Sequence, residues 1–382
     1  MSSHQAGSVL ITGGAGFIGA NLAHRLLRHG NHVRILDNLS RAGVRANLDW
    51  LQSEHKDGLE VQLADVRDEA AVRRAVEQVD CIYHLAAQVA VTSSLENPVA
   101  DFEINVRGTL NVLEAMRRLA RAPALVLTST NKVYGALDDV ALDIEGERYL
   151  PADRGLRKRG IDERRQLDFH SPYGCSKGAA DQYVLDYARS YHLPTVVFRM
   201  SCIYGPHQFG NEDQGWLAHF MLRALQGESI TIYGDGRQVR DVLFVEDLLD
   251  ALLLASQQAT QLAGHAFNMG GGTTRTLSLL ELVELIQQRC ASRVELKFES
   301  WRRGDQRYYV SDTRRFSAAS GWRARTGIQQ GLEQLWSWLS ENYAGTSARY
   351  ETTADTAAIA ASAAAAANAA ARRSSADGVV PS

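Results

Sequence analysis

Six apolar runs, separated by stretches with helical periodicity, dominate the first two-thirds of the chain. They are SVLIT at 8–12, HVRILD at 32–37, LEVQLAD at 59–65, CIYHLAA at 81–87, ALVLTST at 124–130 and TVVFRMS at 195–201. The helical stretches lie near 17–29, 68–78, 101–120 and 173–191. A strand that is apolar throughout is buried on both faces, so this alternation predicts a doubly wound α/β fold with a parallel sheet.

Past about residue 200 the alternation loosens, and Gly-rich turns such as YGDGRQ and MGGGTT become frequent. One more strand and helix are predicted over about 239–256, and LSLLELVELIQQRC at 277–290 has strong helical periodicity. We predict a Rossmann domain over 1–200 and 238–262, and a smaller C-terminal α/β lobe that binds the substrate over 201–237 and 263–345. The Ala-rich segment 346–382 has few large apolar side chains, so we expect it to be disordered.

Charge and composition exclude several classes of protein. The net charge of −3 gives no reason to expect nucleic acid or an anionic membrane as a partner. There is no run of 18 apolar residues and no basic segment followed by an apolar one at the N-terminus, so we expect neither a membrane span nor a secretory signal. The four cysteines are far apart and form no C-x-x-C, which favours a cytoplasmic protein without disulfides or a zinc site.

The turn after the first apolar run carries Gly13, Gly16 and Gly19 at three-residue spacing. A dinucleotide pyrophosphate needs a tight turn, close approach of the backbone and a helix N-terminus, and a Gly-rich turn between a strand and a helix provides all three. Asp37 ends the second run, where a carboxylate binds a ribose 2′-hydroxyl and repels a 2′-phosphate. We therefore predict an NAD site, although Arg41 nearby leaves NADP open.

Tyr173 and Lys177 stand four residues apart at the start of a predicted helix, so they share one face of it. A free tyrosine has a pKa of about 10, too high for a general base at neutral pH. A lysine ammonium one turn away and a positive nicotinamide ring would favour the phenolate. With the Thr130 hydroxyl at the end of the fifth apolar run, these side chains predict oxidation of an alcohol and reduction of a ketone.

Five sequence features occur together: TGGAGFIG at 12–19, Asp37, HLAA at 84–87, STNKVYG at 129–135 and YGCSK at 173–177. They resemble the extended short-chain dehydrogenase/reductase family. Within it the chain is similar to nucleotide-sugar epimerases and dehydratases, and most of all to 2-epimerases of CDP-deoxyhexoses. The finer likeness rests also on DNLSRAG, DFEINV, QLDFHSPYGCSKGAADQY, DQGW, GDGRQVRD and RRGDQR, and the resemblance runs from residue 9 to about 312.

The resemblance implies a role for each matched position. Thr130, Tyr173 and Lys177 match the catalytic hydroxyl, base and lysine. Cofactor contacts are implied for Gly13, Gly16, Phe17, Ile18, Gly19, Asp37, Asn38, Asp65, Val66, Leu85, Ala86, Ala87, Thr128, Tyr173 and Lys177. Substrate contacts are implied for Gln88, Asn131, Lys132, Ser201, Gln208, Gln214, Arg240, Arg303 and Asp305, with the two arginines holding the diphosphate. Cys202 departs from the Asn of many relatives, which leaves Ser201 or a lobe residue to replace an amide donor.

The residues Thr130, Asn131 and Lys132 distinguish two possible reactions, epimerisation and loss of water. The family's 4,6-dehydratases read Thr-Asp-Glu there, and their acid pair moves protons during loss of water. An amide cannot act as an acid or base, and a lysine is a cation at neutral pH unless buried. The chain keeps the hydroxyl for alcohol oxidation without the acid pair for elimination. The predicted reaction is therefore epimerisation by reversible hydride transfer, and the resemblance places it at C2 of a CDP-deoxyhexose.

Two alternatives stay open. One is a 4-epimerase of UDP-hexoses, which a panel of substrates would separate from a 2-epimerase. The other is an NAD-binding regulatory module without activity, which lack of turnover on every nucleotide sugar would favour. The resemblance further implies a bacterial cytoplasmic enzyme of polysaccharide biosynthesis with tightly bound NAD, assembled as a homodimer or homotetramer.

Overall fold

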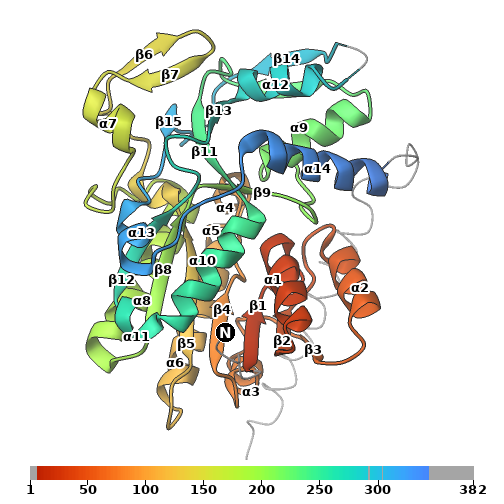
Figure 1. The fold of residues 1–382 in the computed structure, drawn as a ribbon. Coiled ribbons are helices and arrows are strands. Elements are labelled where there is room, and N and C mark those ends of the chain that lie inside the picture. Colours follow the sequence, from red (N-terminus) through yellow and green to blue (C-terminus); the bar gives the residue numbers. More distant parts are fainter. Residues whose placement is uncertain (1–6, 291–292, 303, 344–382) are drawn as a thin grey trace, which may run out of the picture. The chain divides into compact units, whose positions relative to one another are not determined.

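A seven-stranded parallel sheet forms the centre of the protein, in a computed structural model that describes residues 7–290, 293–302 and 304–343 (Figure 1). The strand order is β12-β8-β5-β4-β1-β2-β3. The bounds are β1 (Ser8–Thr12), β2 (His32–Asp37), β3 (Leu59–Leu63), β4 (Cys81–His84), β5 (Ala124–Thr130), β8 (Thr195–Met200) and β12 (His265–Met269). All six predicted strands lie in this sheet, and the predicted doubly wound α/β fold is confirmed. The edge strand β12 comes from the segment predicted for the lobe.

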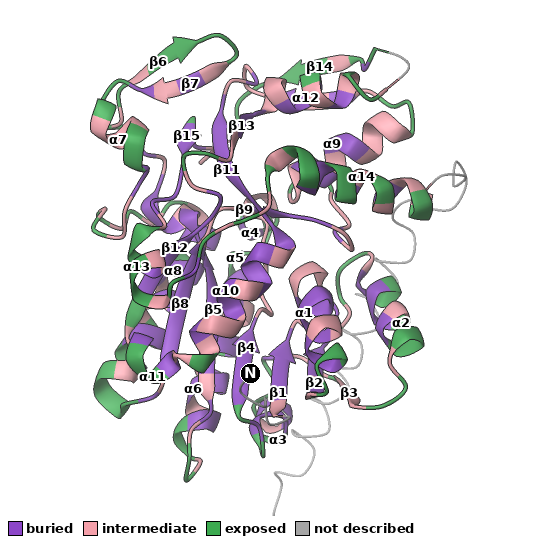
Figure 2. Ribbon diagram, in the orientation of Figure 1, coloured by how far each residue is buried: buried purple, intermediate pink, exposed green. Residues whose placement is uncertain are grey.

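Helices cover both faces of the sheet. Neighbouring residues of β4 show this, because Ile82 packs in the core under α3 (Glu69–Val76), α6 (Gly108–Arg117) and α8 (Ser171–Tyr191), whereas the Tyr83 hydroxyl bonds Ser256 of α10 (Val245–Gln257). The helices α1 (Phe17–Arg28) and α11 (Ala259–Leu262) contact α10 on this second face of the sheet. Burial on both sides explains why the central strands β4, β5 and β8 are mostly apolar, and Figure 2 shows them buried. The edge strand β3 has no buried residue, and polar Glu60 and Gln62 alternate there with apolar residues.

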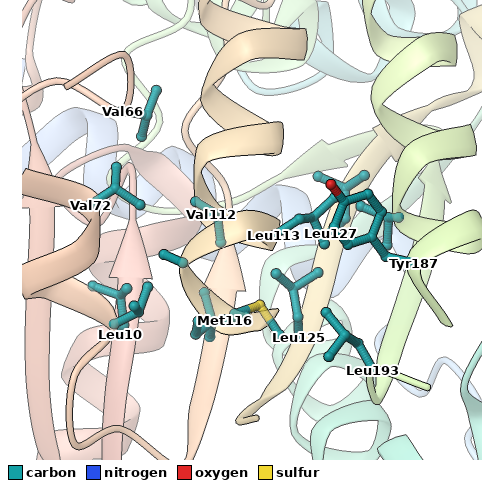
Figure 3. Close-up of a cluster of buried hydrophobic side chains, with 14 of the residues drawn as sticks. Leu10, Val66, Val72, Val112, Leu113, Met116, Leu125, Leu127, Tyr187 and Leu193 are labelled. Atoms are coloured by element: carbon teal, nitrogen blue, oxygen red, sulfur yellow. The ribbon is translucent and has the colours of Figure 1, made fainter. Parts of the chain in front are cut away.

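The core under α3, α6 and α8 is built mainly from aliphatic side chains, with Tyr187 beside them (Figure 3). Leu10, Val112, Met116 and Leu125 are fully buried there. Each such side chain stabilises the fold by about 1.5–3 kcal/mol relative to exposure. The strands are thereby held in register, and the loops at their carboxyl ends start from fixed points.

The predicted helices are present, with differences in detail. The stretch near 101–120 is divided into α5 (Pro98–Phe102), a π-helical turn η1 (Glu103–Arg107) and α6. The helix at 277–290 is α12 (Leu279–Gln287), which starts with a capping box between Ser278 and Glu281. Several helices lie outside the predicted stretches: α2 (Val44–Glu54), the short α4 (Val91–Glu96), α7 (Arg154–Arg159), α9 (Trp216–Leu225), α11, α13 (Arg314–Ser320) and α14 (Ile328–Tyr343).

The remaining elements gather around a second, smaller sheet (Figure 1). In it β11 (Val239–Phe244) pairs with β9 (Cys202–Tyr204), β13 (Thr276–Ser278) and β15 (Tyr308–Tyr309), and β10 (Ile230–Tyr233) pairs separately with β14 (Leu296–Glu299). The helices here are α9 (Trp216–Leu225), α12 and α14 (Ile328–Tyr343). The helix α13 (Arg314–Ser320) packs instead on the large sheet, where Phe316 contacts Phe198 of β8 and Phe267 of β12. A 3-10 turn η2 (Asn131–Tyr134), the hairpin of β6 (Leu142–Glu145) and β7 (Arg148–Pro151), and α7 (Arg154–Arg159) connect β5 to α8.

The division into a cofactor domain and a substrate lobe stays a prediction, and the Ala-rich segment 346–382 lies outside the described residues. Within the described part, no helix is long and apolar enough to cross a membrane. No group of three or more His, Cys, Asp or Glu side chains in that part could hold a metal ion.

A buried ion pair joins α8 to β8. Arg199 Nε lies 2.8 Å from Asp181 Oδ2, and the side chains are 5% and 0% exposed. A second bond joins the same two groups at 2.9 Å, and Arg199 also donates to the Tyr134 hydroxyl at 3.2 Å. Because α8 begins with Tyr173 and Lys177, this pair helps to fix where both side chains lie relative to the sheet.

Replacement of Asp181 by alanine should destabilise the fold strongly. Asp181→Ala leaves the Arg199 guanidinium buried without its carboxylate, which typically costs about 3–5 kcal/mol. The free energy of unfolding in urea, followed by circular dichroism, measures this loss. Asp186→Ala on the exposed side of the same helix is the control, with an expected change within about 0.5 kcal/mol. Equal stabilities of the two variants would contradict the role of the pair.

Candidate active site

A cavity of about 540 Å³ opens at the carboxyl ends of the sheet strands. One wall is the Gly-rich turn and the start of α1, and a second is the end of β5 with the start of α8. A third comes from the segments around β9 and β11 and from Arg302, Gly304 and Asp305. Loops at this edge of a doubly wound sheet are the usual place for a ligand. The cavity is therefore the candidate active site.

The glycines of the first turn are required by close backbone packing. Gly13 has φ +70, and a Cβ there would lie 2.7 Å from the Ala86 nitrogen. A Cβ on Gly19 would lie 2.4 Å from the Gly13 carbonyl oxygen. Gly16 is the N-cap of α1 without a side-chain cap, so the first N–H groups of the helix are available at the cavity wall. These features fit a dinucleotide pyrophosphate.

Asp37 supports the Gly-rich turn from the end of β2. Its carboxylate accepts hydrogen bonds from the Ala15 nitrogen at 3.0 Å and the Leu39 nitrogen at 2.8 Å. Burial raises the pKa of Asp37, and these N–H donors oppose the rise. Arg41, which left NADP open, directs its guanidinium to the side chain of Gln214 across the cavity. The predicted contact of Asp37 with a ribose stays a prediction.

Thr130, Tyr173 and Lys177 all line the cavity and are nearly buried. Lys177 Nζ donates to the Thr128 carbonyl oxygen at 2.6 Å, and burial lowers the pKa of Lys177 to about 8. Burial also raises the pKa of Tyr173 to about 12, while a hydrogen bond with Thr130 partly lowers it. The predicted lowering of the tyrosine pKa required both Lys177 and a positive nicotinamide ring. The raised pKa shows that the protein alone does not prepare Tyr173 as a base.

The segment after Thr130 contacts the loop around residue 305. Asn131 Nδ2 donates to Gln306 Oε1 at 2.9 Å, and Gln306 Nε2 donates to the Gly135 carbonyl oxygen at 2.6 Å. Lys132 Nζ donates to the Gly304 carbonyl oxygen at 3.0 Å. The segment STNKVYG of the second wall therefore contacts residues 304–306 of the third, although the two are far apart in the sequence.

The structure brings most of the predicted site residues to the cavity. The predicted cofactor residues that line it are Gly13, Gly16, Phe17, Ile18, Gly19, Leu85, Ala87, Thr128, Tyr173 and Lys177. The predicted substrate residues that line it are Asn131, Lys132, Ser201, Gln208, Gln214, Arg240 and Asp305. Arg303 lies outside the described residues.

The other predicted residues do not line the cavity: Asp37, Asn38, Asp65, Val66, Ala86 and Gln88. Asn38 Nδ2 donates to Asp65 Oδ2 at 2.8 Å, so these two stabilise the ends of β2 and β3 together. The Gln88 amide bonds both backbone groups of Ala90, at 2.8 Å and 2.9 Å. Its side chain shapes a turn, and a substrate contact would require it to leave that turn.

Several cavity residues were missed by sequence reasoning. Buried side-chain oxygens without a hydrogen-bond partner line the cavity at Asn47, Thr92, Ser129, Gln208 and Gln238. Of these only Gln208 was predicted. Ser129 could have been found, because it precedes Thr130 in the same motif, whereas no pattern marks Thr92. At Cys202 the thiol accepts a hydrogen bond from Trp216 Nε1 at 3.4 Å, so a lobe residue already contacts the position of the missing amide.

Residues 9–270 match the model of the NAD dependent epimerase/dehydratase family. The chain belongs to this family. It is 43% identical over 341 residues to the CDP-paratose 2-epimerase of Salmonella typhi, covering 87% of this chain and 99% of that protein. It is 30% identical to a putative UDP-glucose 4-epimerase of Methanocaldococcus jannaschii, covering 87% and 99%.

Solved structures agree with this assignment. The UDP-glucose 4-epimerase of Thermus thermophilus in complex with NAD is 32% identical, with a TM-score of 0.71 and coverage of 87% of this chain and 98% of that one. A dTDP-glucose 4,6-dehydratase of Streptomyces venezuelae with NAD and TYD bound is 28% identical, with a TM-score of 0.75 and coverage of 88% and 98%. The predicted NAD-dependent enzyme acting on a nucleotide sugar is confirmed.

The predicted NAD site and the close packing at Gly19 can be tested by identifying the nucleotide that copurifies with the protein. A redox-neutral cycle has no need to release NAD, so the purified protein should yield NAD, and not NADP, when it is denatured and its supernatant is chromatographed. Gly19→Ala should lose the nucleotide, because its Cβ meets rigid backbone at the turn. Gly327→Ala is the control, since a Cβ there meets no atom within 4 Å and its nucleotide content should not change. Mainly NADP in the wild type would show that Asp37 has been misinterpreted.

Proposed function

We propose that the enzyme inverts C2 of a CDP-deoxyhexose, in the manner of the conversion of CDP-paratose to CDP-tyvelose. The reaction is a transient oxidation to a keto-sugar followed by reduction on the other face. The observation that carries this proposal is the placement of Thr130, Tyr173 and Lys177 in one cavity beside Asn131 and Lys132. The 43% identity to a CDP-paratose 2-epimerase supports the choice of sugar and nucleotide.

In the proposed reaction, side chains of this protein remove the hydroxyl proton and later return it. Tyr173 takes the proton of the C2 hydroxyl, and Thr130 hydrogen-bonds the same oxygen as it becomes a carbonyl. Lys177, held by the Thr128 carbonyl, keeps a positive charge behind Tyr173. In the return step Tyr173 gives the proton back to the same oxygen, so its protonation state is unchanged over the cycle.

The raised pKa of Tyr173 indicates that a positive charge beyond those of the protein is needed before Tyr173 can act as a base. Burial raises that pKa to about 12, and the Thr130 hydrogen bond does not compensate for it. When bound, NAD supplies the hydride acceptor and a positive ring charge of the kind that lowers the pKa of a nearby phenol. Tyr173 is thus suited to act as a base only in the complete complex, which prevents proton abstraction in an empty site.

The diphosphate end of the substrate is assigned to the third cavity wall. Arg240 and Arg303 are the proposed diphosphate ligands, and Asp305 lies near the ribose in this proposal. Arg240 is 7% exposed and its side chain is held by the Val239 carbonyl oxygen and by Asp305, so its guanidinium is fixed at the cavity wall. Fixed cations of this kind bind phosphates well because little side-chain freedom is lost.

A second candidate function is 4-epimerisation of a UDP-hexose. The likeness to the putative UDP-glucose 4-epimerase of Methanocaldococcus jannaschii and to the Thermus thermophilus enzyme favours it. Both candidates use the same catalytic groups, and they differ in the nucleotide sugar that is bound and in which of its carbons lies beside Tyr173.

We also propose that the enzyme is a homodimer or homotetramer. Large apolar side chains are exposed on neighbouring helices: Leu95 of α4, Val99 and Phe102 of α5, and Tyr183 of α8, at 45%, 70%, 47% and 43%. These helices contact one another, so the side chains share one region of the surface. An apolar patch on helices that support the active site is what a second copy of the chain would cover.

The proposed location is the cytoplasm. All four cysteines, Cys81, Cys175, Cys202 and Cys290, are free thiols in the described structure. Free cysteines in this number are typical of a reducing compartment.

The assignment of Tyr173 as the base can be tested by one substitution. Tyr173→Phe removes the phenol oxygen and keeps the ring, so folding should survive while turnover falls by about 10²-fold or more. Tyr191→Phe at the exposed C-terminal end of the same helix is the matched control and should stay within about threefold of wild type. Turnover of Tyr173→Phe inside that range would exclude Tyr173 as the base.

The position and mechanism of inversion can be tested with isotopes. CDP-paratose carrying deuterium at C2 is converted in ordinary water, and unlabelled CDP-paratose is converted in heavy water, with NMR of both products. Hydride transfer keeps the label at C2 of the inverted sugar in the first reaction and adds no deuterium in the second. Exchange with solvent at C2 would overturn the mechanism. Inversion of a UDP-hexose at C4, without action on CDP-paratose, would favour the second candidate.

A further inference from the structure

Lys132 is held in a fixed position relative to the catalytic hydroxyl. Its backbone nitrogen donates to Thr130 Oγ1 at 3.2 Å, and its side chain lines the same cavity. The ammonium donates to the Gly304 carbonyl oxygen at 3.0 Å and lies 3.5 Å from Asp305 Oδ1. A cation therefore stands at the end of the chain segment that carries Thr130.

This cation shares its carboxylate with a second one. Arg240 Nη2 lies 2.9 Å from the same Asp305 Oδ1, so two positive groups face one negative group at the cavity wall. The other carboxylates that line the cavity in the described part of the chain, Glu212 and Asp213, pair with Arg302 at 3.7 Å and 3.4 Å. Burial and Arg240 lower the pKa of Lys132, and Asp305 opposes them. Lys132 and Arg240 therefore share the single carboxylate of Asp305, and an anion bound beside these two cations would stabilise them.

Substrate chemistry indicates which anion belongs there. In a sugar nucleotide the β-phosphate is attached through oxygen to C1, and C1 is bonded directly to C2. C4 lies on the opposite side of the sugar ring. An enzyme that oxidises C2 must therefore hold the β-phosphate next to its catalytic hydroxyl, whereas a 4-epimerase must hold it a full ring away.

We propose that Lys132 binds the β-phosphate of the substrate and thereby places C2, and not C4, beside Thr130 and Tyr173. The inference rests on the proposed function and deepens it, because it makes Lys132 the residue that selects the carbon. The acid found at this position in the dehydratases would repel the same phosphate. The residue thus excludes elimination chemistry and selects the reacting carbon through one charge.

Nucleotide binding separates this role from a structural one. Lys132→Met keeps the length of the side chain and removes the charge, and isothermal titration of the NAD-containing enzyme with CDP and with CMP isolates the β-phosphate. Affinity for CDP should fall about 10- to 100-fold, as for a lost charged hydrogen bond, while affinity for CMP stays within about twofold. Lys132→Arg should restore most of the selectivity for CDP. Lys158→Met, on the exposed side of α7, should change neither affinity.

The alternative is that Lys132 only anchors the loop that carries Asp305. Lys132→Met and Asp305→Asn would then weaken CDP and CMP binding in parallel, with an unchanged ratio, and this result would overturn the inference. It would leave C2 inversion by the wild-type enzyme, and hence the proposed function, intact. Conversely, inversion at C4 by a wild type whose Lys132 binds the β-phosphate would overturn the proposed function and the selection of C2.

Discussion

The hydrogen bond from Lys177 to the Thr128 carbonyl joins α8 to the end of β5, and the arrangement of the active site depends on it. A lysine side chain that is only 5% exposed needs a strong acceptor, and a carbonyl at the end of a buried strand is one. With α8 held there, Tyr173 reaches Thr130 on the same strand. The Arg199–Asp181 pair fixes the same helix to β8, so α8 is attached to two neighbouring strands.

Much of this arrangement could be predicted, because buried parallel strands are recognisable in a sequence as short apolar runs. Six of the seven sheet strands are apolar runs, and parallel strands end at one edge, so Thr130 and the Gly-rich turn had to lie near each other. The seventh strand, HAFNM, was not predicted as part of the sheet, because it is short and includes His265 and Asn268. Asn268 is fully buried, but its amide bonds the Ile161 carbonyl oxygen and the Tyr134 hydroxyl, which no local pattern reveals.

Other features could not be predicted, since they depend on contacts between segments far apart in the chain. The pairing of Asn131 with Gln306 joins residues 175 positions apart. The pKa of Tyr173 depends on how deeply α8 is buried, so its rise was not visible in the spacing of Tyr173 and Lys177. The helix α2 follows a left-handed Gly43 and has only a narrow apolar stripe, Val44, Leu48 and Leu51, which is a weak signal in eleven residues.

The end of β5 therefore contacts both halves of the reaction. The Thr128 carbonyl holds Lys177, which we assign to the cofactor, and the Thr130 hydroxyl bonds Tyr173. Asn131 and Lys132 bond residues 304–306, which we assign to the substrate. The five consecutive residues from Thr128 to Lys132 thus connect the proposed base Tyr173 to the part of the cavity wall that carries Lys132 and Arg240. This explains physically why the residues that separate an epimerase from a dehydratase lie at this point. In the proposed role of Lys132, a change of charge at this residue alters both which proton transfers are available and where the phosphate end of the sugar lies.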